Sequence, residues 1–374
     1  MLARRWFRLA SGLVVLLALL GTAVYRRARL DTPPATTMLL DRHGRFLGEV
    51  GADERLGFWS VDPLPVRVVA ATLIVEDRRF YSHPGIAPRA VARAIRQNVS
   101  DVDRVSGAST IAMQVARLQD PGRRTYLRKV VESLTALALV GRHGRKRVLA
   151  QYLTLAPYGN NVHGISYAAR RYFNKPVEDL SWAETAFLAG MPQSPSLMNP
   201  YTPLGRARGV ARAERILDLL LADGALPPID HDRAVAELAS LHFPPRPVRP
   251  AATLHPVLHF ERTLKSVKPM VHTTLDLDVQ TQVQQTLRQA IKKWEERGAG
   301  NAAAVVVRRD GWEVLAAVGS TDWANPRFAG AIDYTRTPRY PGSTLKPFVY
   351  AASLDRGDIT PNTILDDLTR GPDG

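Results

Sequence analysis

The sequence contains no cysteine, so it can form neither disulfide bonds nor thiolate metal sites, and it has no cysteine nucleophile. It also lacks zinc-finger spacing and a basic heptad region, and we therefore expect no nucleic acid partner. No internal repeat or low-complexity segment is evident. The remaining composition is that of a globular protein: 45% of the 374 residues are hydrophobic and 23% are charged.

Acidic residues are few compared with basic ones. The chain has 50 Lys and Arg but only 35 Asp and Glu, which gives a net charge of +15. A basic surface favours anionic partners, such as acidic lipid headgroups or a pyrophosphate substrate. Charge alone does not choose between these partners.

One long apolar run lies near the N-terminus. Residues 9–25 read LASGLVVLLALLGTAVY, with arginines on both sides. This length is at the short end of the ~17–25 residues that span a bilayer. We interpret residues 1–30 as a cytoplasmic tip and an uncleaved transmembrane signal anchor, with a cleaved secretory signal as the alternative. No second apolar span follows, so we expect the rest of the chain on the periplasmic or extracellular side of the cytoplasmic (inner) membrane.

Helical periodicity dominates the part of the chain that follows. A short hairpin is predicted at residues 38–50, and apolar residues then recur at helical spacing up to about residue 220. Gly and Pro separate these stretches. We predict a mainly α domain over residues 31–242. Its later helices are expected near residues 88–99, 108–118, 146–156, 164–173, 181–190 and 206–222.

Proline separates this helical region from the rest of the chain. Residues 243–256 read FPPRPVRPAATLHP, and this proline content excludes a regular helix or a central strand. We assign residues 243–267 as a linker. Beyond it, strand-like and helical segments alternate, with a hairpin turn at Asp310-Gly311. Residues 268–374 therefore read as the opening of an α/β domain.

The first segment that could carry chemistry is ATLIVEDRRFYSHPGI, residues 71–86. Glu76 and Asp77 close an apolar helix there, and a compact aromatic turn follows. A carboxylate beside apolar walls is desolvated, which raises its pKa and lets it act as a general base near neutral pH. Taken alone, a solvent-facing acid at a helix end is the commoner interpretation.

The second segment is GASTIAMQVARL, residues 107–118. Ser109 and Thr110 are residues of the N-cap type, and the free N–H groups at a helix start suit a phosphate. Gln114 and Arg117 follow within the predicted helix. Alone, this segment is an ordinary capped helix.

The third segment is YLRKVVESLTALALV, residues 126–140. Arg128, Lys129 and Glu132 are spaced so that the acid shares a helix face with both bases. A surface ion pair of small energetic value is one interpretation. The other is a cationic face for pyrophosphate, on which Glu132 orients a base or a metal.

Taken together, the three segments resemble the glycosyltransferase domain of class A penicillin-binding proteins, which is glycosyltransferase family 51. The resemblance covers about residues 38–225, in order and with family-like spacing, and residues 149–165 and 180–200 resemble the fourth and fifth motifs. It is closest to the 1C branch of the family. The residues that match the first three motifs are Glu76, Asp77, Phe80, His83 and Gly85; Gly107, Ser109, Thr110, Ile111 and Gln114; and Arg128, Lys129 and Glu132.

Residues 341–346, PGSTLK, resemble the Ser-x-x-Lys motif of the family's penicillin-binding transpeptidase. Ser343 and Lys346 would share a helix face as a catalytic nucleophile and its proton acceptor. No Ser-x-Asn or Lys-Thr-Gly motif follows before Gly374. The resemblance therefore implies an incomplete β-lactamase/transpeptidase-like domain, which we expect to be inactive in this chain.

The resemblance implies a lysozyme-like, mainly α glycosyltransferase domain that joins lipid II to a growing glycan strand. Glu76 would take the proton of the acceptor sugar, and undecaprenyl pyrophosphate would leave with inversion at the donor. Glu132 would assist at the pyrophosphate, together with a divalent cation, Mg²⁺ or Mn²⁺. The substrate-binding residues that it implies are Asp77, Phe80, His83, Ser109, Thr110, Gln114, Arg117, Arg128 and Lys129.

Several residues depart from the family's pattern. Met113 stands where many relatives have a Gln, Arg117 replaces a common Lys, Arg147 occupies a usual Glu position, and Thr154 a usual Asn. Both principal glutamates are present, which favours an enzyme. The departures leave open a catalytically weak or inactive scaffold for other cell-wall synthesis proteins. A glycan-cleaving hydrolase is disfavoured, because that reaction needs no pyrophosphate-binding face.

Overall fold

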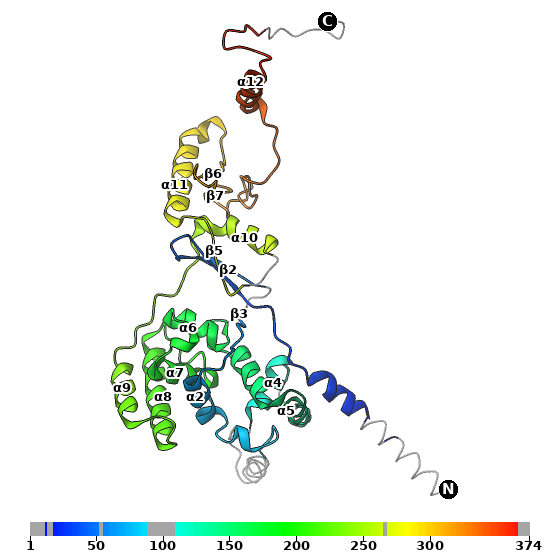
Figure 1. Cartoon of the computed structure of the whole chain (residues 1–374), viewed down its shortest axis with the longest axis vertical. Helices are drawn as coiled ribbons and strands as arrows, with labels where there is room; N and C mark the ends of the chain where they lie inside the picture. Colours follow the sequence, from blue (N-terminus) through cyan, green and yellow to red (C-terminus); the bar gives the residue numbers. More distant parts are fainter. Residues whose placement is uncertain are drawn as a thin grey trace.

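The computed structural model describes residue 12 and residues 18–51, 55–87, 109–123, 125–264 and 268–365. Figure 1 shows a helical body, a small central sheet above it, and a C-terminal unit that ends in helix α12, arranged along one long axis. Residues 18–27 form a helix that leads away from the helical body. Most of the predicted anchor, and the helix predicted at residues 88–99, lie outside the described residues. Within the described part of the chain, no helix is both long enough and apolar enough to cross a membrane.

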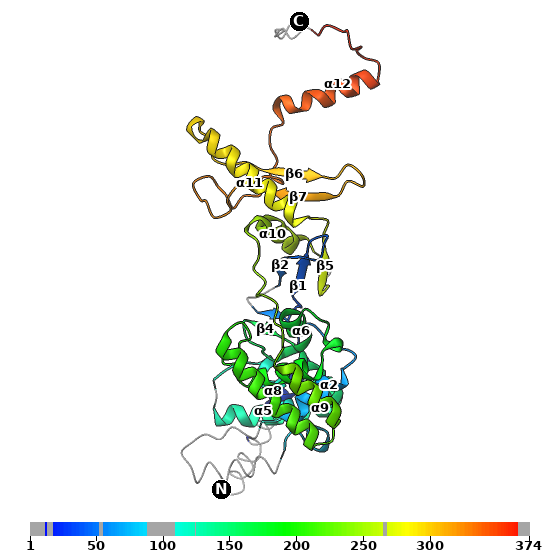
Figure 2. The same cartoon turned by 90° about the vertical axis from the view of Figure 1, so that its left-hand side faces the viewer.

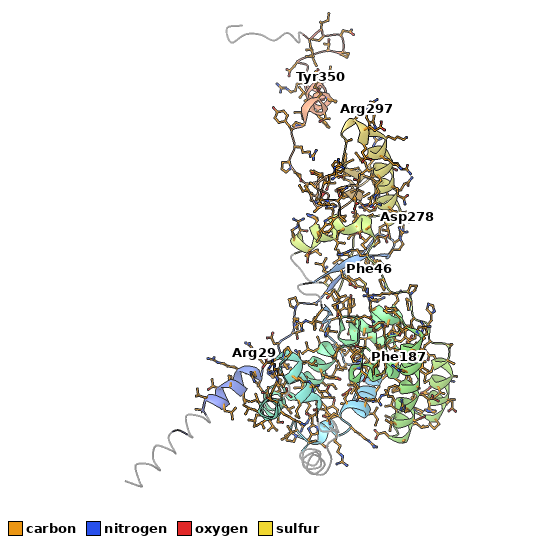
Figure 3. All side chains as sticks on the ribbon, turned by 180° about the vertical axis from the view of Figure 1, so that it is seen from behind. Arg29, Phe46, Phe187, Asp278, Arg297 and Tyr350 are labelled. Atoms are coloured by element: carbon orange, nitrogen blue, oxygen red, sulfur yellow. The ribbon has the colours of Figure 1, made fainter. Side chains whose placement is uncertain are left out.

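The helical body confirms the mainly α prediction, and its residues bury one large core. Phe187 of α7, labelled in Figure 3, is fully buried in this core. Helix α7 packs against both α2 and α8, which places the end of α2 inside the body. The elements are α2 (Val66–Glu76), η1 (Phe80–Ser82), α4 (Ile111–Gln119), α5 (Tyr126–Leu155), α6 (Ile165–Phe173), η2 (Val177–Asp179), α7 (Trp182–Gly190), η3 (Met191–Gln193), α8 (Pro203–Ala222) and α9 (Pro228–Leu238).

Polar side chains set where these helices begin. The hydroxyl oxygens of Thr110, Thr125 and Thr202 accept hydrogen bonds from backbone N–H groups in the first turns of α4, α5 and α8. Ser181 and Glu184 form a reciprocal capping box at the start of α7. These caps satisfy N–H groups that have no partner within their helix.

Helix α5 combines two segments that the sequence predicts as separate helices. It runs from Tyr126 to Leu155, and Gly144 interrupts it with φ 76° and ψ 158°. A glycine adopts this positive φ without the steric cost that a side chain would add. The first half of α5 packs against α4 and carries Arg128 and Glu132.

The predicted N-terminal hairpin is confirmed, but its partner lies far along the chain. Strands β1 (Thr37–Leu40) and β2 (Phe46–Val50) pair antiparallel, and β1 also pairs in parallel with β5 (Met270–His272). The sheet order is β2-β1-β5. This sheet therefore joins two strands of the predicted helical domain, residues 31–242, to a strand that lies beyond the predicted linker, in residues 268–374. Its own small core consists of Leu39, Leu47, Val257 and Leu275.

The proline-rich linker contains more regular structure than the sequence predicts. A short η4 (Ala251–Thr253) leads into α10 (Leu254–Thr263), which packs on β2. The prediction that proline excludes a helix as far as residue 256 is therefore wrong at its end. Pro256 is the third residue of α10, and an N–H group in the first turn has no intrahelical partner that proline would remove.

The C-terminal part has the alternating elements that the sequence predicts, but they build only a small unit within the described residues. Figure 2 shows α11 lying across the β6–β7 hairpin, with α12 beyond it at the far end. The side chains of Phe348 and Val349 in α12 are exposed. The elements are α11 (Leu277–Trp294), η5 (Glu295–Arg297), β6 (Ala304–Val307), β7 (Val314–Val318), η6 (Gly342–Leu345) and α12 (Lys346–Asp355). A short two-residue pair, β3 (Leu56–Gly57) with β4 (Val162–His163), completes the strands of the described ranges.

Candidate active site

Helix α2 positions Glu76. Its Val68, Ala71 and Thr72 side chains are buried, and the helix packs against α7 and α8. The helix ends at Glu76, because Asp77 adopts φ −163° and ψ 73°. The Glu76 side chain therefore projects from the C-terminal end of a partly buried helix. The partial negative charge of a helix C-terminus makes a carboxylate less favourable there.

The two carboxylate oxygens of Glu76 have different surroundings. Oε2 accepts a hydrogen bond of 2.9 Å from the Nε2 amide of Gln114, in α4. Oε1 is buried and has no hydrogen-bond partner among the described residues. Burial raises the pKa of Glu76, although the amides of Gln114 and Gln193 and the charges of Arg212 and Arg117 act to lower it. Desolvation is the larger effect, so the carboxyl group is a stronger base than an exposed glutamate.

Two buried tyrosines lie close to this carboxylate. Tyr152 and Tyr158 are each 1% exposed. Burial, and then the charge of Glu76, raise the pKa of both phenols, so both stay protonated at neutral pH. The hydroxyl group of Tyr152, like Oε1 of Glu76, is buried without a hydrogen-bond partner in the described part of the chain. Unpartnered buried polar atoms are uncommon in proteins and often mark a functional site.

A hydrogen-bonded turn holds Glu76 against α4. His83 Nε2 lies 2.9 Å from Asp77 Oδ1, and Asp77 Oδ2 accepts a hydrogen bond of 3.1 Å from the N–H of Ile111. Thr110 Oγ1 donates to the carbonyl oxygen of Gly85 at 2.6 Å. These bonds tie the residues after Glu76 to the start of α4. They thereby bring Glu76 within reach of Gln114.

Four of the predicted substrate-binding residues are parts of this support. Phe80, His83 and Thr110 are 1%, 6% and 3% exposed, and the Asp77 side chain is 8% exposed. The side chains of Asp77, His83 and Thr110 are bonded within the protein and help to hold the residues around Glu76 in place. Their contact with substrate stays a prediction. Ser109 is half-buried, at the edge of the described residues. Gly107, the first residue of the second motif, lies outside them.

Glu132 lines a pocket with Ala116 of α4 and with Asp120 at the end of that helix. Glu76 contacts Gln114, and Ala116 lies about half a helical turn around α4 from Gln114, so the two glutamates meet different faces of this helix.

Glu132 Oε1 is 3.3 Å from Arg128 Nε, and both side chains are mostly buried. Asp120, at the end of α4, lies 3.7 Å from Arg128 and 3.0 Å from Arg27 at the end of the N-terminal helix. Charged groups thus surround Glu132. No hydrogen bond or ion pair between described residues joins it directly to Glu76.

The two predicted cations of the third segment have different exposures. Arg128 is engaged with Asp120 and Glu132, whereas Lys129 is exposed. Arg117 lies within α4, near enough to Glu76 for its charge to act on the carboxylate. The sequence predicts that Arg117, Arg128 and Lys129 bind one pyrophosphate. In the structure, Arg117 acts on Glu76, whereas Arg128 lies beside Glu132.

A transglycosylase family model matches residues 43–220 of the chain, which include both glutamates and their surroundings. This part of the chain is a transglycosylase domain. Penicillin-binding protein 1C of Escherichia coli K12 is 33% identical over 84% of this chain and 40% of that protein. Penicillin-binding protein 1A of Aquifex aeolicus is 31% identical over 70% of this chain and 36% of that protein.

The chain spans about half the length of its curated relatives or less. The share is 52% for penicillin-binding protein 2D of Bacillus subtilis, which is 27% identical over 96% of this chain. A solved structure, penicillin-binding protein 1A from Haemophilus influenzae, matches 83% of this chain and 35% of that chain. At 18% identity and a TM-score of 0.39, it is too distant to support an argument about the site.

The transglycosylase domain offers few ligands for a divalent cation. Over the described ranges, no three His, Asp or Glu side chains gather as a metal site would require. Glu132 contacts Arg128. A Mg²⁺ ion held by one carboxylate would need substrate phosphates and water for its remaining ligands. These residues do not form a protein-only cation site, and we assign no reaction step to a cation.

The predicted transpeptidase residues lie far from the transglycosylase domain. Ser343 is in η6 and Lys346 begins α12, and its N–H bonds to the Ser343 carbonyl oxygen. Both residues are exposed, and no side-chain interaction between them is present in the described part of the chain. Their pairing as nucleophile and base stays a prediction.

Sequence analysis missed four residues around Glu76: Tyr152, Tyr158, Gln193 and Arg212. Gln193 lies in the segment that resembles the fifth motif, and that resemblance was the available signal. Arg212 lies in the middle of α8, where helical periodicity gives no reason to select one arginine among several. Its side chain nevertheless donates to Gln193, with 2.6 Å between Nη2 and Oε1.

Proposed function

We propose that the chain is a peptidoglycan glycosyltransferase that polymerises lipid II into glycan strands during cell-wall synthesis. One observation carries the proposal. In a transglycosylase domain, Glu76 is a buried carboxyl group of raised pKa with one oxygen held by Gln114 and the other unpartnered. These are the properties that a general base needs near neutral pH.

The Glu76 oxygen without a partner, Oε1, accepts the proton of the acceptor sugar's 4-hydroxyl. That hydroxyl oxygen then forms a bond to the anomeric carbon of the donor, and the bond from this carbon to the pyrophosphate oxygen breaks. Attack opposite to the leaving group inverts the anomeric carbon, as in inverting glycosidases, where water takes the place of the sugar hydroxyl. Undecaprenyl pyrophosphate leaves, and Glu76 later returns its proton to water.

The leaving pyrophosphate needs positive charge at the moment the bond breaks. Arg117, beside Glu76, supplies one such charge, and Arg128 and Lys129 of α5 supply others. Glu132 holds Arg128 in place through their 3.3 Å contact. A divalent cation, Mg²⁺ or Mn²⁺, stays part of the proposal only as a charge that the bound substrate would bring with it, and no step described here depends on it.

The proposal includes a membrane location, with residues 1–30 as a single-pass anchor in the cytoplasmic (inner) membrane. The described helix over residues 18–27 is fixed to the transglycosylase domain at its end. Arg27 pairs with Asp120 at 3.0 Å, and Arg142 lies 4.7 Å above the Tyr25 ring. These contacts support a domain held close to the membrane, where a lipid-linked substrate is found.

Polymerisation of labelled lipid II by the purified full chain tests the proposal. We expect a ladder of glycan products, and Glu76→Gln should lower the rate ~10²–10⁴-fold, the usual contribution of a general base. Glu214→Gln, which removes an exposed carboxylate from α8, is the matched control and should leave the rate unchanged. A chain that binds lipid II without polymerising it would instead support the scaffold alternative.

A further inference from the structure

A cavity of about 500 Å³ lies where the chain enters the transglycosylase domain from the N-terminal helix. Leu30 and Thr32, just after that helix, line one side, residues 60–64 line another, and the second half of α5 lines the third. Figure 3 labels Arg29, next to Leu30, where the N-terminal helix meets the helical body. None of the described residues placed around Glu76 or Glu132 lines this cavity, so it is separate from the candidate active site.

A buried glutamine holds one side of the cavity in place. Gln151 of α5 donates to the carbonyl oxygen of Asp31 at 2.8 Å, and its Oε1 accepts a hydrogen bond of 3.0 Å from Thr32 Oγ1. Its amide nitrogen also donates to Gln119, at the end of α4. These bonds tie the segment after the N-terminal helix to α4 and α5, so the protein alone fixes this side of the cavity.

Three charged side chains line the cavity without a partner. Lys146 and Arg147 are on its α5 side, and Asp62 is on the side of residues 60–64. In the part of the chain that the structure describes, no hydrogen bond or ion pair engages any of these three side chains. Opposite charges therefore line the same space and do not neutralise each other. A ligand that carries both a negative and a positive group would complement them.

The cavity also has an apolar part, because Leu30, Val61 and Leu64 line it beside the charged side chains. Two other lining residues, Arg147 and Thr154, stand at positions where the sequence departs from the family's pattern. Arg147 places a cation where an acid is usual, which favours an anionic group in the ligand. Charges of both signs beside apolar side chains fit an amphiphile with a charged headgroup.

The cavity lies close to the proposed membrane surface. Arg27 is the last residue of the N-terminal helix, and the chain from Arg27 to Leu30 spans about 11 Å at most. The polar layer on each side of a bilayer is about 5–8 Å thick. With residues 1–30 as the membrane anchor, Leu30 lies next to the lipid headgroups.

We propose that this cavity binds the headgroup of a membrane phospholipid that carries both a phosphate and a primary ammonium group, as phosphatidylethanolamine does. Lys146 and Arg147 bind the phosphate, and Asp62 accepts hydrogen bonds from the ammonium group. Leu30 and Leu64 contact the start of the acyl chains. The proposal rests on the membrane location proposed above, but not on polymerisation of lipid II. Lipid bound here fixes the height of the transglycosylase domain on the membrane.

Solvated surface charges alone predict something different. The chain has a net charge of +15, so it attracts anionic lipids through many residues. Phosphatidylethanolamine and phosphatidylcholine both have no net charge, and only the first has an ammonium group that donates hydrogen bonds. A preference between these two lipids therefore does not follow from the net charge of the protein.

Native mass spectrometry of the full chain in detergent, with each lipid added separately, tests the proposal. We expect one phosphatidylethanolamine molecule to be retained several-fold more strongly than phosphatidylcholine. Arg147→Gln should lower its retention several-fold, and so should Asp62→Asn, which should not lower the retention of anionic phosphatidylglycerol. Arg208→Gln and Asp179→Asn, which remove exposed charges outside the cavity, are the matched controls. Equal retention of the two uncharged lipids, or losses in the controls as large as in the cavity variants, overturns the proposal.

A competition experiment identifies the source of the phosphate. Free phosphoethanolamine at the concentration of the lipid should not displace it, because the free compound lacks the apolar part. Displacement at equal concentration would overturn the assignment to a lipid. Thermal melting confirms that each variant is folded, and Lys146→Gln repeats the test if Arg147→Gln is not. Lipid II is absent from these measurements, so they decide the ligand of the cavity even if the chain does not polymerise lipid II and the proposed function fails.

Discussion

The two faces of helix α4 surround two glutamates in different ways. On one face, Gln114 holds Glu76 with a neutral amide, and one carboxylate oxygen has no partner among the described residues. On the other face, Asp120 joins Arg128 and Glu132 in a group of charges. The two acids have the same chemistry in the unfolded chain. The folded protein raises the pKa of one and places the other beside a cation.

The difference follows from where α2 and α5 place their side chains. Glu76 ends a partly buried helix, and its carboxyl group is largely removed from water without an ion pair to any described residue. Glu132 lies one helical turn after Arg128, so an ion pair forms within α5 itself. A buried acid without a contacting cation prefers to hold a proton, which is the situation of Glu76. These surroundings agree with the roles that we propose, proton transfer at Glu76 and charge stabilisation on the other face of α4.

The largest expected effect is a loss of turnover in Glu76→Gln, and it should differ in kind from the effect of Glu132→Gln on the other face of α4. Glu76→Gln should lower turnover ~10²–10⁴-fold while lipid II still binds, because only the proton acceptor is lost. Glu132→Gln should weaken binding of the lipid-linked substrate, because it releases Arg128 from its position. Binding of labelled lipid II and single-turnover rates measure the two quantities separately. Equal loss of binding in Glu76→Gln would break the comparison.

A double-mutant cycle tests whether residues on the same face of α4 depend on one another more than residues on different faces do. Arg128→Ala and Glu132→Gln remove two members of one group, so their effects on substrate binding should couple by ~0.5–3 kcal/mol. Gln114→Leu acts on the other face and should add to Arg128→Ala without such coupling. Coupling of equal size across α4 would show that the helix does not separate two independent regions.

The sequence predicted the main helices, because these depend on local patterns. Apolar residues at helical spacing predicted α6 and α7, whereas Glu76 and Glu132 were selected because their segments resemble the family's motifs. The caps of these helices are also local, since a hydroxyl or carboxylate lies within a few residues of the N–H group that it satisfies.

Contacts between distant segments could not be predicted in this way. Strand β1 pairs with β5, more than two hundred residues later, because apolar alternation identifies a strand but not its neighbour. The bonds of Asp77 to His83 and to the N–H of Ile111 depend on where α4 packs. Arg212 reaches Gln193 for the same reason.

A smaller effect is expected from the cap that begins α4. Thr110 accepts a hydrogen bond from the N–H of Met113 and donates one to the carbonyl oxygen of Gly85. Thr110→Ala removes both bonds and should lower the free energy of unfolding by ~1–2 kcal/mol. Thr125→Ala, at the exposed start of α5, is the comparison and should cost less. Urea unfolding of the two variants measures the difference, and an equal loss would contradict it.

The smallest effect is a gain in stability when the base itself is removed. Burial raises the pKa of Glu76 above its ordinary value of 4.5. As the pH rises, Glu76 in the unfolded chain therefore loses its proton first, and the folded state becomes less stable through the pH range up to its own higher pKa. Glu76→Gln cannot ionise, so it should melt at a higher temperature than the wild type at pH 8. The two should melt alike at pH 4, where Glu76 is protonated in both states.

Two further variants show whether this gain is specific to the Glu76 face. Glu214→Gln removes an exposed carboxylate and should give the same difference from the wild type at pH 4 and pH 8. Glu132→Gln removes one member of an ion pair with Arg128 and should lower the melting temperature at pH 8. At pH 8, the melting temperature should rise in Glu76→Gln and fall in Glu132→Gln. Opposite changes of this kind would show that burial destabilises the carboxylate of Glu76, whereas the contact with Arg128 stabilises that of Glu132. A lower melting temperature for Glu76→Gln at pH 8 than at pH 4, relative to the wild type, would show that Glu76 is stabilised as a carboxylate and is not the base.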